Sequence, residues 1–214
     1  MLGKEIYRIS LEIKDKYFTI KNYNKTELKV TKSVFISELF PVQDSDEIND
    51  NLKSAREKYF DARHHPYAYR LGIDKNNFRA NDDGEPSGTS GKPILEAIDK
   101  YELTNVLIVV TRYFGGVKLG AGGLRRAYSE AALTSIEKEN MIEKFMYENI
   151  KMEFGYEFIG PVMNFIESNN FRIINNISDD KVKLECEIRL SLTENFKKDL
   201  FNITKGSIIF SINN

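Results

Sequence analysis

This chain of 214 residues has few cysteines and no long apolar run, and each of these absences excludes certain classes of protein. A single cysteine, Cys186, excludes an intrachain disulfide framework and a zinc site built from several cysteines. No apolar run approaches the ~18 residues that a membrane-spanning helix needs. Residues 1–16 carry charges where a signal peptide has its apolar stretch. We therefore expect a soluble protein of the cytoplasm that makes no membrane contact.

An excess of positive charge is also missing. The chain has 31 Lys and Arg residues against 32 Asp and Glu residues, which leaves a formal net charge of -1. Proteins that bind nucleic acids non-specifically usually carry a strong positive excess. The composition therefore predicts no DNA binding and confines any contact with RNA to a local patch.

Glycine, by contrast, is concentrated in two blocks. These blocks read DDGEPSGTSGKPIL at 82–95 and TRYFGGVKLGAGGLRRAY at 111–128. Nine of the chain's 13 glycines lie in these blocks or just before them, counting Gly72. Glycine is favoured where the backbone needs a positive φ or must approach another group closely. The pattern predicts two glycine-rich loops, and loops held by a scaffold are common places for binding residues.

The two loops carry opposite charge, so we expect them to form the binding region. The first is acidic and the second is basic, with aromatic residues between its cations. The candidate binding residues are His64, Asp82, Asp83, Glu85, Arg112, Tyr113, Lys118, Arg125 and Arg126.

The basic loop allows two interpretations. A glycine-rich turn between a buried strand and a helix offers backbone N–H groups to an anion. However, Arg125 stands where G-x-G-x-x-G needs its third glycine, and Ala121 stands where a Walker motif has its lysine. Anion or RNA-phosphate binding and mere close packing of the glycines therefore both remain open. Likewise, Tyr113, Phe114 and Tyr128 suit either stacking on the bases of a single strand or a place in the core.

The acidic loop suits a structural role better than a metal site. It lacks the D-x-D-x-D-G spacing of a calcium loop, and its carboxylates suit turns in which they bond loop amides or the facing arginines. His64 and His65 are adjacent, so in an extended chain they point to opposite sides and make a poor metal clamp. No arrangement of nucleophile and base is recognisable around the loop hydroxyls. We expect no metal, no cofactor and no catalytic residue, and we favour a protein that is not an enzyme.

Hydrophobic periodicity predicts the elements around these loops. We expect strands at 17–20 and 28–40 with a turn at 22–27, a helix after Pro41, a strand at 67–73, a helix from Pro93, a strand at 105–110 buried on both faces, and a helix from about Gly122.

A second pattern begins near residues 139–144. It predicts strand 145–154, helix 157–168, strands 171–177 and 181–190, helix 193–201 and strand 207–212. This order is the βαββαβ unit of ferredoxin-like domains, with Cys186 on the core side. We therefore expect an α+β protein with domains at 1–140 and 141–214, in which residues 1–16 are an added strand or an extension.

The two glycine-rich blocks, in this order and at this separation, strongly resemble the signature of the YigZ/IMPACT family. Further matches are Lys32-Ser33, Pro41-Val42 and Asp61-Ala62, so the resemblance covers about residues 17–135. It implies an N-terminal β-α-β domain similar to the second domain of ribosomal protein S-five. The C-terminal pattern agrees with the second domain of bacterial members, which looks like a domain of the translocation elongation factor.

The same resemblance implies a function in translation. Eukaryotic relatives are translational regulators, so the expected partners are RNA, the ribosome or a translation-associated protein. The alternative is an enzyme for a small or phosphate-bearing ligand, with its site between the 82–91 and 112–126 loops and with His64 as the proton carrier. Some family members carry an old Xaa-Pro dipeptidase label, but this sequence offers no two-metal ligand set to support it.

Overall fold

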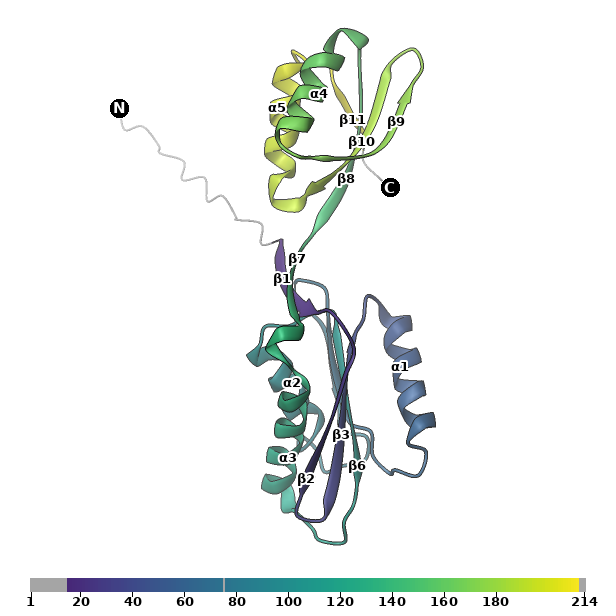
Figure 1. Cartoon of the computed structure of the whole chain (residues 1–214), viewed down its shortest axis with the longest axis vertical. Helices are drawn as coiled ribbons and strands as arrows, with labels where there is room; N and C mark the ends of the chain where they lie inside the picture. The colour runs from purple at the N-terminus through teal and green to yellow at the C-terminus, as the bar shows by residue number, and fades with distance from the viewer. Residues whose placement is uncertain (1–14, 75, 212–214) are drawn as a thin grey trace, which may run out of the picture. The chain divides into compact units, whose positions relative to one another are not determined.

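A computed structural model describes residues 15–74 and 76–211 of the chain (Figure 1). Contacts divide the chain into an N-terminal unit, Tyr17–Lys144, and a C-terminal unit, Phe145–Asn214, which also includes Asp15 and Lys16. The expected strand or extension at residues 1–16 lies outside the described residues except at those two positions. No helix in the described ranges is both long and apolar enough to cross a membrane.

The N-terminal unit is built on a five-stranded sheet with the strand order β2-β3-β6-β4-β5. Its elements are β1 (Lys16–Ile20), β2 (Asn24–Val30), β3 (Ser33–Pro41), α1 (Ser45–Lys58), β4 (Tyr67–Leu71), β5 (Asn77–Asn81), α2 (Gly91–Lys100), β6 (Val106–Tyr113), α3 (Gly120–Ser135), the 3₁₀ helix η1 (Lys138–Asn140) and β7 (Met141–Phe145). Helix α1 covers one face of the sheet, and α2 and α3 cover the other (Figure 1). Both β3 and β4 run antiparallel to β6, which lies between them. The segment β3-α1-β4 is therefore the expected β-α-β crossover.

Strand β6 is the centre of this unit. Its side chains alternate between the two layers: Val106, Ile108 and Val110 pack with α2 and α3, whereas Leu107 and Val109 pack with α1. All of these side chains are buried. The continuous apolar run is therefore explained by burial on both faces, as predicted.

The polar strands differ from the expectation. The predicted turn at 22–27 is wrong, because β2 begins at Asn24 and the chain reverses at Thr31 and Lys32, where Thr31 has a φ of 57°. Strand β2 is an edge strand whose residues are exposed or half-buried. Because no face of it is fully buried, its polar sequence resembles a turn. The edge strand β5 and strand β7, which pairs with β1, escaped prediction for the same reason.

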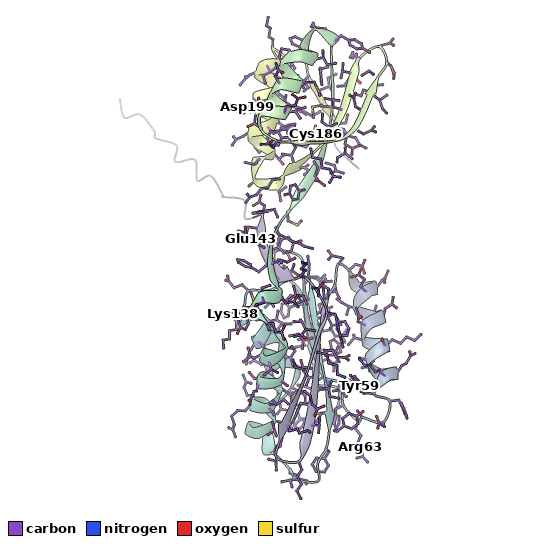
Figure 2. All side chains as sticks on the ribbon, viewed as in Figure 1. Tyr59, Arg63, Lys138, Glu143, Cys186 and Asp199 are labelled. Carbon is purple, nitrogen blue, oxygen red and sulfur yellow. The ribbon has the colours of Figure 1, made fainter. Side chains whose placement is uncertain are left out.

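The C-terminal unit confirms the βαββαβ prediction. Its elements are β8 (Tyr147–Phe154), the 3₁₀ helix η2 (Tyr156–Phe158), α4 (Ile159–Ser168), β9 (Arg172–Ser178), β10 (Val182–Arg189), the 3₁₀ helix η3 (Leu190–Leu192), α5 (Thr193–Ile203) and β11 (Ile209–Ser211). The antiparallel order β11-β8-β10-β9 is that of a ferredoxin-like sheet. Cys186 lies in the core, as expected, and burial raises the pKa of its thiol to about 11 (Figure 2).

Arg189 binds Asp15 through two hydrogen bonds, of 2.7 and 2.8 Å, and holds the pKa of that carboxyl well below its usual range.

A buried carboxylate lies on the α1 side of the N-terminal sheet. Glu38 in β3 is 2% exposed, and its Oε1 accepts hydrogen bonds from Lys58 Nζ and Tyr23 Oη, each at 2.6 Å. Burial and the hydrogen bond to Glu38 raise the pKa of the Tyr23 phenol to about 12. Lys58 therefore supplies the positive charge that a buried carboxylate requires as a partner.

We expect Lys58→Met to lower the free energy of unfolding by about 1–3 kcal/mol, because it leaves a buried carboxylate without its cation. Urea unfolding measures this, with Lys53→Met on the exposed side of α1 as the control. Adding Glu38→Gln to the Lys58→Met variant should restore most of the loss, since the amide carries no charge and still accepts from Tyr23. Equal stability of the two single lysine variants would contradict this account.

Candidate functional site

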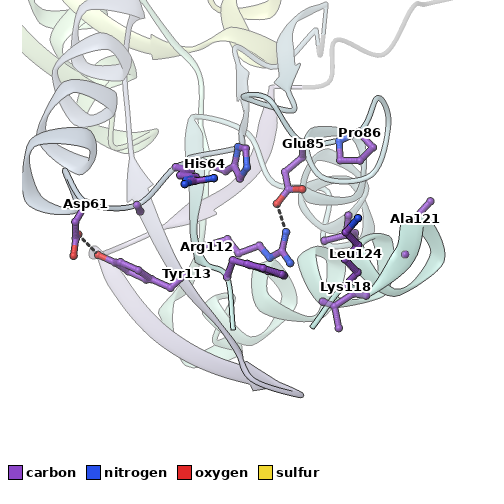
Figure 3. Close-up of a pocket in the computed structure, with 14 residues that line it drawn as sticks. Asp61, His64, Glu85, Pro86, Arg112, Tyr113, Lys118, Ala121 and Leu124 are labelled. Atoms are coloured by element: carbon purple, nitrogen blue, oxygen red, sulfur yellow. Dashed lines mark hydrogen bonds and ion pairs between the residues drawn. The ribbon is translucent and has the colours of Figure 1, made fainter. Parts of the chain in front are cut away.

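A pocket of about 860 Å³ lies entirely within the N-terminal unit. The segment after α1 forms one wall, the acidic loop forms another, and the end of β6 with the start of α3 closes it. Its lining residues are Asp61, Ala62, Arg63, His64, Glu85, Pro86, Arg112, Tyr113, Phe114, Lys118, Leu119, Gly120, Ala121 and Leu124 (Figure 3). The volume falls within the range of small-ligand sites, which is about 300–1,000 Å³.

Arg112 at the end of β6 forms the base of this pocket. It is 8% exposed, and its Nη1 donates to Glu85 Oε1 at 2.8 Å (Figure 3). Tyr128 of α3 donates its hydroxyl to the same oxygen at 2.7 Å. Burial, and then the adjacent Glu85 carboxylate, raise the pKa of that phenol far above its usual value. The ion pair therefore joins the acidic loop, β6 and α3 at one buried point.

The guanidinium of Arg112 also lies close to two aromatic rings. Its central carbon is 5.6 Å from the ring centroid of Phe35 and 5.5 Å from that of Phe114. Phe35 is fully buried, whereas Phe114 is 58% exposed and lines the pocket. Arg112 Nε has no hydrogen-bond partner among the described residues. The arginine is thus held by stacking as well as by its ion pair.

The segment after α1 contributes fixed polar groups. Tyr113 donates its hydroxyl to Asp61 Oδ1 at 2.7 Å, and this hydrogen bond raises the pKa of the phenol to about 12. His64 Nδ1 is 2.9 Å from the backbone oxygen of Asp83. A carbonyl oxygen only accepts, so Nδ1 carries a proton and the neutral ring keeps its lone pair on Nε2. His65 points elsewhere, with Nε2 3.2 Å from the Tyr59 carbonyl, and burial lowers the pKa of its ring.

The start of α3 offers backbone amides to the pocket. Gly120 and Ala121 line the pocket, no side chain of the described ranges caps the first turn of α3, and that turn has no acidic residue. Gly120 needs glycine because its φ is +68°. Gly115 serves close packing instead, since a Cβ there would lie 1.8 Å from the Lys32 carbonyl oxygen. Close packing therefore explains Gly115 and backbone conformation explains Gly120, whereas anion binding by this loop stays a prediction.

The acidic loop is organised by Asp82. Its carboxylate accepts from the backbone N–H groups of Gly88, Ser90 and Gly91, at 2.7, 3.0 and 2.8 Å, and from the Ser90 hydroxyl at 2.8 Å. Asp83 accepts from the backbone N–H of His65 at 2.7 Å and from Arg56 at 3.1 Å. The expectation of carboxylates that bond loop amides and facing arginines is confirmed.

The structure brings together some of the candidate binding residues and separates others. The pocket unites His64, Glu85, Arg112, Tyr113 and Lys118. Asp82 and Asp83 lie outside its lining, Arg125 forms an ion pair with Glu96 at 2.7 Å, and Arg126 is exposed on α3. The binding role of all these residues stays a prediction. In the described ranges, no group of three or more His, Cys, Asp or Glu residues is placed to hold a metal ion.

Sequence reasoning did not assign Asp61 or Arg63 to this site. The pairing of His64 with Arg112 explains the omission, since it places the segment after α1 beside the end of β6, 48 positions further along the chain. A motif search cannot detect such a long-range pairing. The Asp61-Ala62 match to the family pattern was the one sequence signal available.

We expect Asp82→Asn to lower the free energy of unfolding by about 2 kcal/mol at neutral pH, since hydrogen bonds to a charged group are worth about 1.5–3 kcal/mol each. Burial alone would raise the pKa of Asp82, but the amides of Gly88, Gly91 and Ser90 and the Ser90 hydroxyl lower it overall. A lowered folded pKa stabilises the fold above the unfolded value of about 3.9 and loses that effect as the pH falls through the folded pKa. The stability difference between wild type and variant should therefore shrink below about pH 4.

Urea unfolding at several pH values measures this difference. Asp50→Asn, at an exposed position of α1, is the control and should change stability little at any pH. A difference that stays constant from neutral pH to about pH 3 would show that the Asp82 carboxylate does not organise the loop through its charge.

Comparison with known proteins matches both units. Residues 31–136 match the Impact N-terminal domain, and residues 152–207 match a domain family of unknown function. The IMPACT family member YvyE of Bacillus subtilis is 33% identical over 190 residues, which cover 89% of this chain and 88% of that protein. YigZ of Escherichia coli is 28% identical over 182 residues, covering 84% of this chain and 89% of that protein.

Two further matches are a eukaryotic relative and a solved structure. Protein IMPACT of Rattus norvegicus is 29% identical over 110 residues, which cover 50% of this chain and 35% of that protein. The crystal structure of a hypothetical protein matches with a TM-score of 0.67 at 25% identity, covering 94% of this chain and 98% of that chain. Both domain matches occur in the expected order, and the Bacillus relative is matched over nearly its whole length, so the chain belongs to the IMPACT family.

Proposed function

We propose that this member of the IMPACT family is a non-enzymatic binding protein that engages single-stranded RNA, either free or as part of the ribosome, and thereby acts in translation in the cytoplasm. One observation carries the proposal. The pocket combines an uncapped helix N-terminus, the exposed Lys118 and the exposed ring of Phe114 in one concave surface.

Each of these groups suits one part of a single-stranded nucleic acid. Backbone N–H groups at a helix N-terminus and a nearby lysine attract phosphate oxygens. An exposed aromatic ring accepts an unstacked base. A concave site of this kind favours a single strand over a duplex, because the bases of a duplex are stacked and paired. The balanced net charge agrees with contact over a small area and not along a whole nucleic acid.

A second candidate function is an enzyme or binding protein for a small phosphate-bearing molecule. The observation in its favour is the orientation of His64, whose Nε2 is free to accept a proton when the ring is neutral. A broad panel of nucleotides and sugar phosphates, tested by thermal shift, distinguishes this candidate. A ligand that raises the melting temperature of the wild type, and of His64→Asn less, would favour it, whereas no shift across the panel would count against it.

The RNA proposal predicts that Lys118→Ala weakens binding of single-stranded RNA and lowers the slope of log K against log salt by about one. Adding Arg126→Ala tests whether the exposed face of α3 contributes further. Lys53→Ala on α1 is the control and should leave the affinity unchanged. Arg112 is left intact, because its removal would leave the buried Glu85 carboxylate without its ion-pair partner.

Fluorescence anisotropy with a labelled RNA, at several salt concentrations, measures both the affinity and the slope. Co-sedimentation with ribosomes, before and after nuclease treatment, then separates RNA from a protein partner. Unaltered binding in the Lys118→Ala/Arg126→Ala variant, or a partner that is retained without RNA, would overturn the proposal.

A further inference from the structure

The exposed ring of Phe114 lies beside a buried, fixed guanidinium. The central carbon of the Arg112 guanidinium is 5.5 Å from the ring centroid of Phe114 and 5.6 Å from that of Phe35, which is fully buried. The ion pair with Glu85 fixes the position of this guanidinium. Phe114 therefore has a fixed neighbour and is still 58% exposed at the pocket. A supported, exposed ring suits stacking on a planar group, because little side-chain freedom is lost on binding.

Groups that favour negative charge line the same pocket, a few residues along the chain. Lys118 and the first residues of α3, Gly120 and Ala121, are members of its lining. The helix dipole and the uncapped amides of α3 favour negative charge there. Arg112 at the base of the pocket is 8% exposed and its charge is paired with Glu85, but its Nε has no hydrogen-bond partner among the described residues, which leaves one N–H donor unused there. A planar group and an anionic group can thus be bound side by side.

The net charge of the pocket lining favours an anion with a single negative charge. Apart from His64, it contains three cationic side chains, Arg63, Arg112 and Lys118, and two acidic ones, Asp61 and Glu85. This leaves one positive charge. A phosphodiester carries one negative charge, whereas a nucleoside triphosphate carries several, so the lining is matched to a phosphate within a chain.

We propose that the pocket binds one unstacked nucleotide of a single-stranded RNA, with its base on Phe114 and its phosphodiester at Lys118 and the N-terminus of α3. This inference depends on the proposed RNA function and specifies its ligand. Recognition of this kind tolerates different bases, since every base has a face that can stack. The pocket then selects for an unpaired nucleotide in a chain over a duplex or a free nucleotide.

The test compares two variants and two RNAs. Phe114→Leu should weaken binding of a short single-stranded RNA by about 5-fold to 100-fold, the range for loss of one base–aromatic stack, whereas Phe114→Tyr should bind like the wild type. Phe78→Leu is a matched control, because Phe78 is also exposed and stacked on an arginine, Arg70, but lies outside the pocket. Urea unfolding of each variant verifies that it is folded.

The second RNA has the same backbone but no bases. Wild type should bind it as weakly as Phe114→Leu binds the complete RNA, and Phe114→Leu should weaken it no further, while Lys118→Ala should weaken both. RNA binding that depends on Lys118 but ignores both Phe114 and the bases would overturn this inference and leave the proposed function intact. Absence of any RNA binding by the wild type would overturn both.

A competition experiment separates the two sources of a nucleotide. A dinucleotide joined by one phosphodiester should displace the labelled RNA at lower concentration than a nucleoside triphosphate does. Stronger displacement by the triphosphate would overturn the assignment of the pocket to a phosphodiester.

Discussion

The buried ion pair between Arg112 and Glu85 is the interaction on which the candidate site depends. It joins the end of the central strand β6 to the acidic loop, and Tyr128 adds α3 to the same carboxylate. Each charge would be costly to bury alone, so each requires the other to be in place. The walls of the pocket are therefore coupled: a loop that moves away leaves an uncompensated charge at the base of the pocket.

The sequence predicted those elements whose burial imposes a regular pattern. The apolar run of β6 and the strict alternation along β10 follow directly from burial on two faces and on one face. The sequence did not predict strands β2, β5 and β7, because no fully buried face constrains their residues. Their place in the fold is decided by the neighbours with which they pair, and that information is not local.

The candidate site was predictable in part for a similar reason. Glycine and charge patterns located both loops, but they could not show how each charge is used. Arg112 is engaged inside the fold, Arg125 is paired with Glu96, and Asp82 bonds amides of its own loop, whereas Lys118 is exposed at the pocket. The same residue type can therefore stabilise the fold at one position and be exposed at another, depending on its contacts with residues distant in the sequence. Only the family resemblance connected the loops to translation.

The close approach of Gly115 to the Lys32 carbonyl gives the short turn between β2 and β3 a role in the dimensions of the pocket. The backbone at Gly115 lies against that turn without room for a side chain, and the next residue back along the chain is Phe114. The position of the Phe114 ring therefore depends on the two-residue connection between β2 and β3, which does not line the pocket. A longer or shorter connection would displace the backbone at Gly115, and with it Phe114, while every lining residue stays the same.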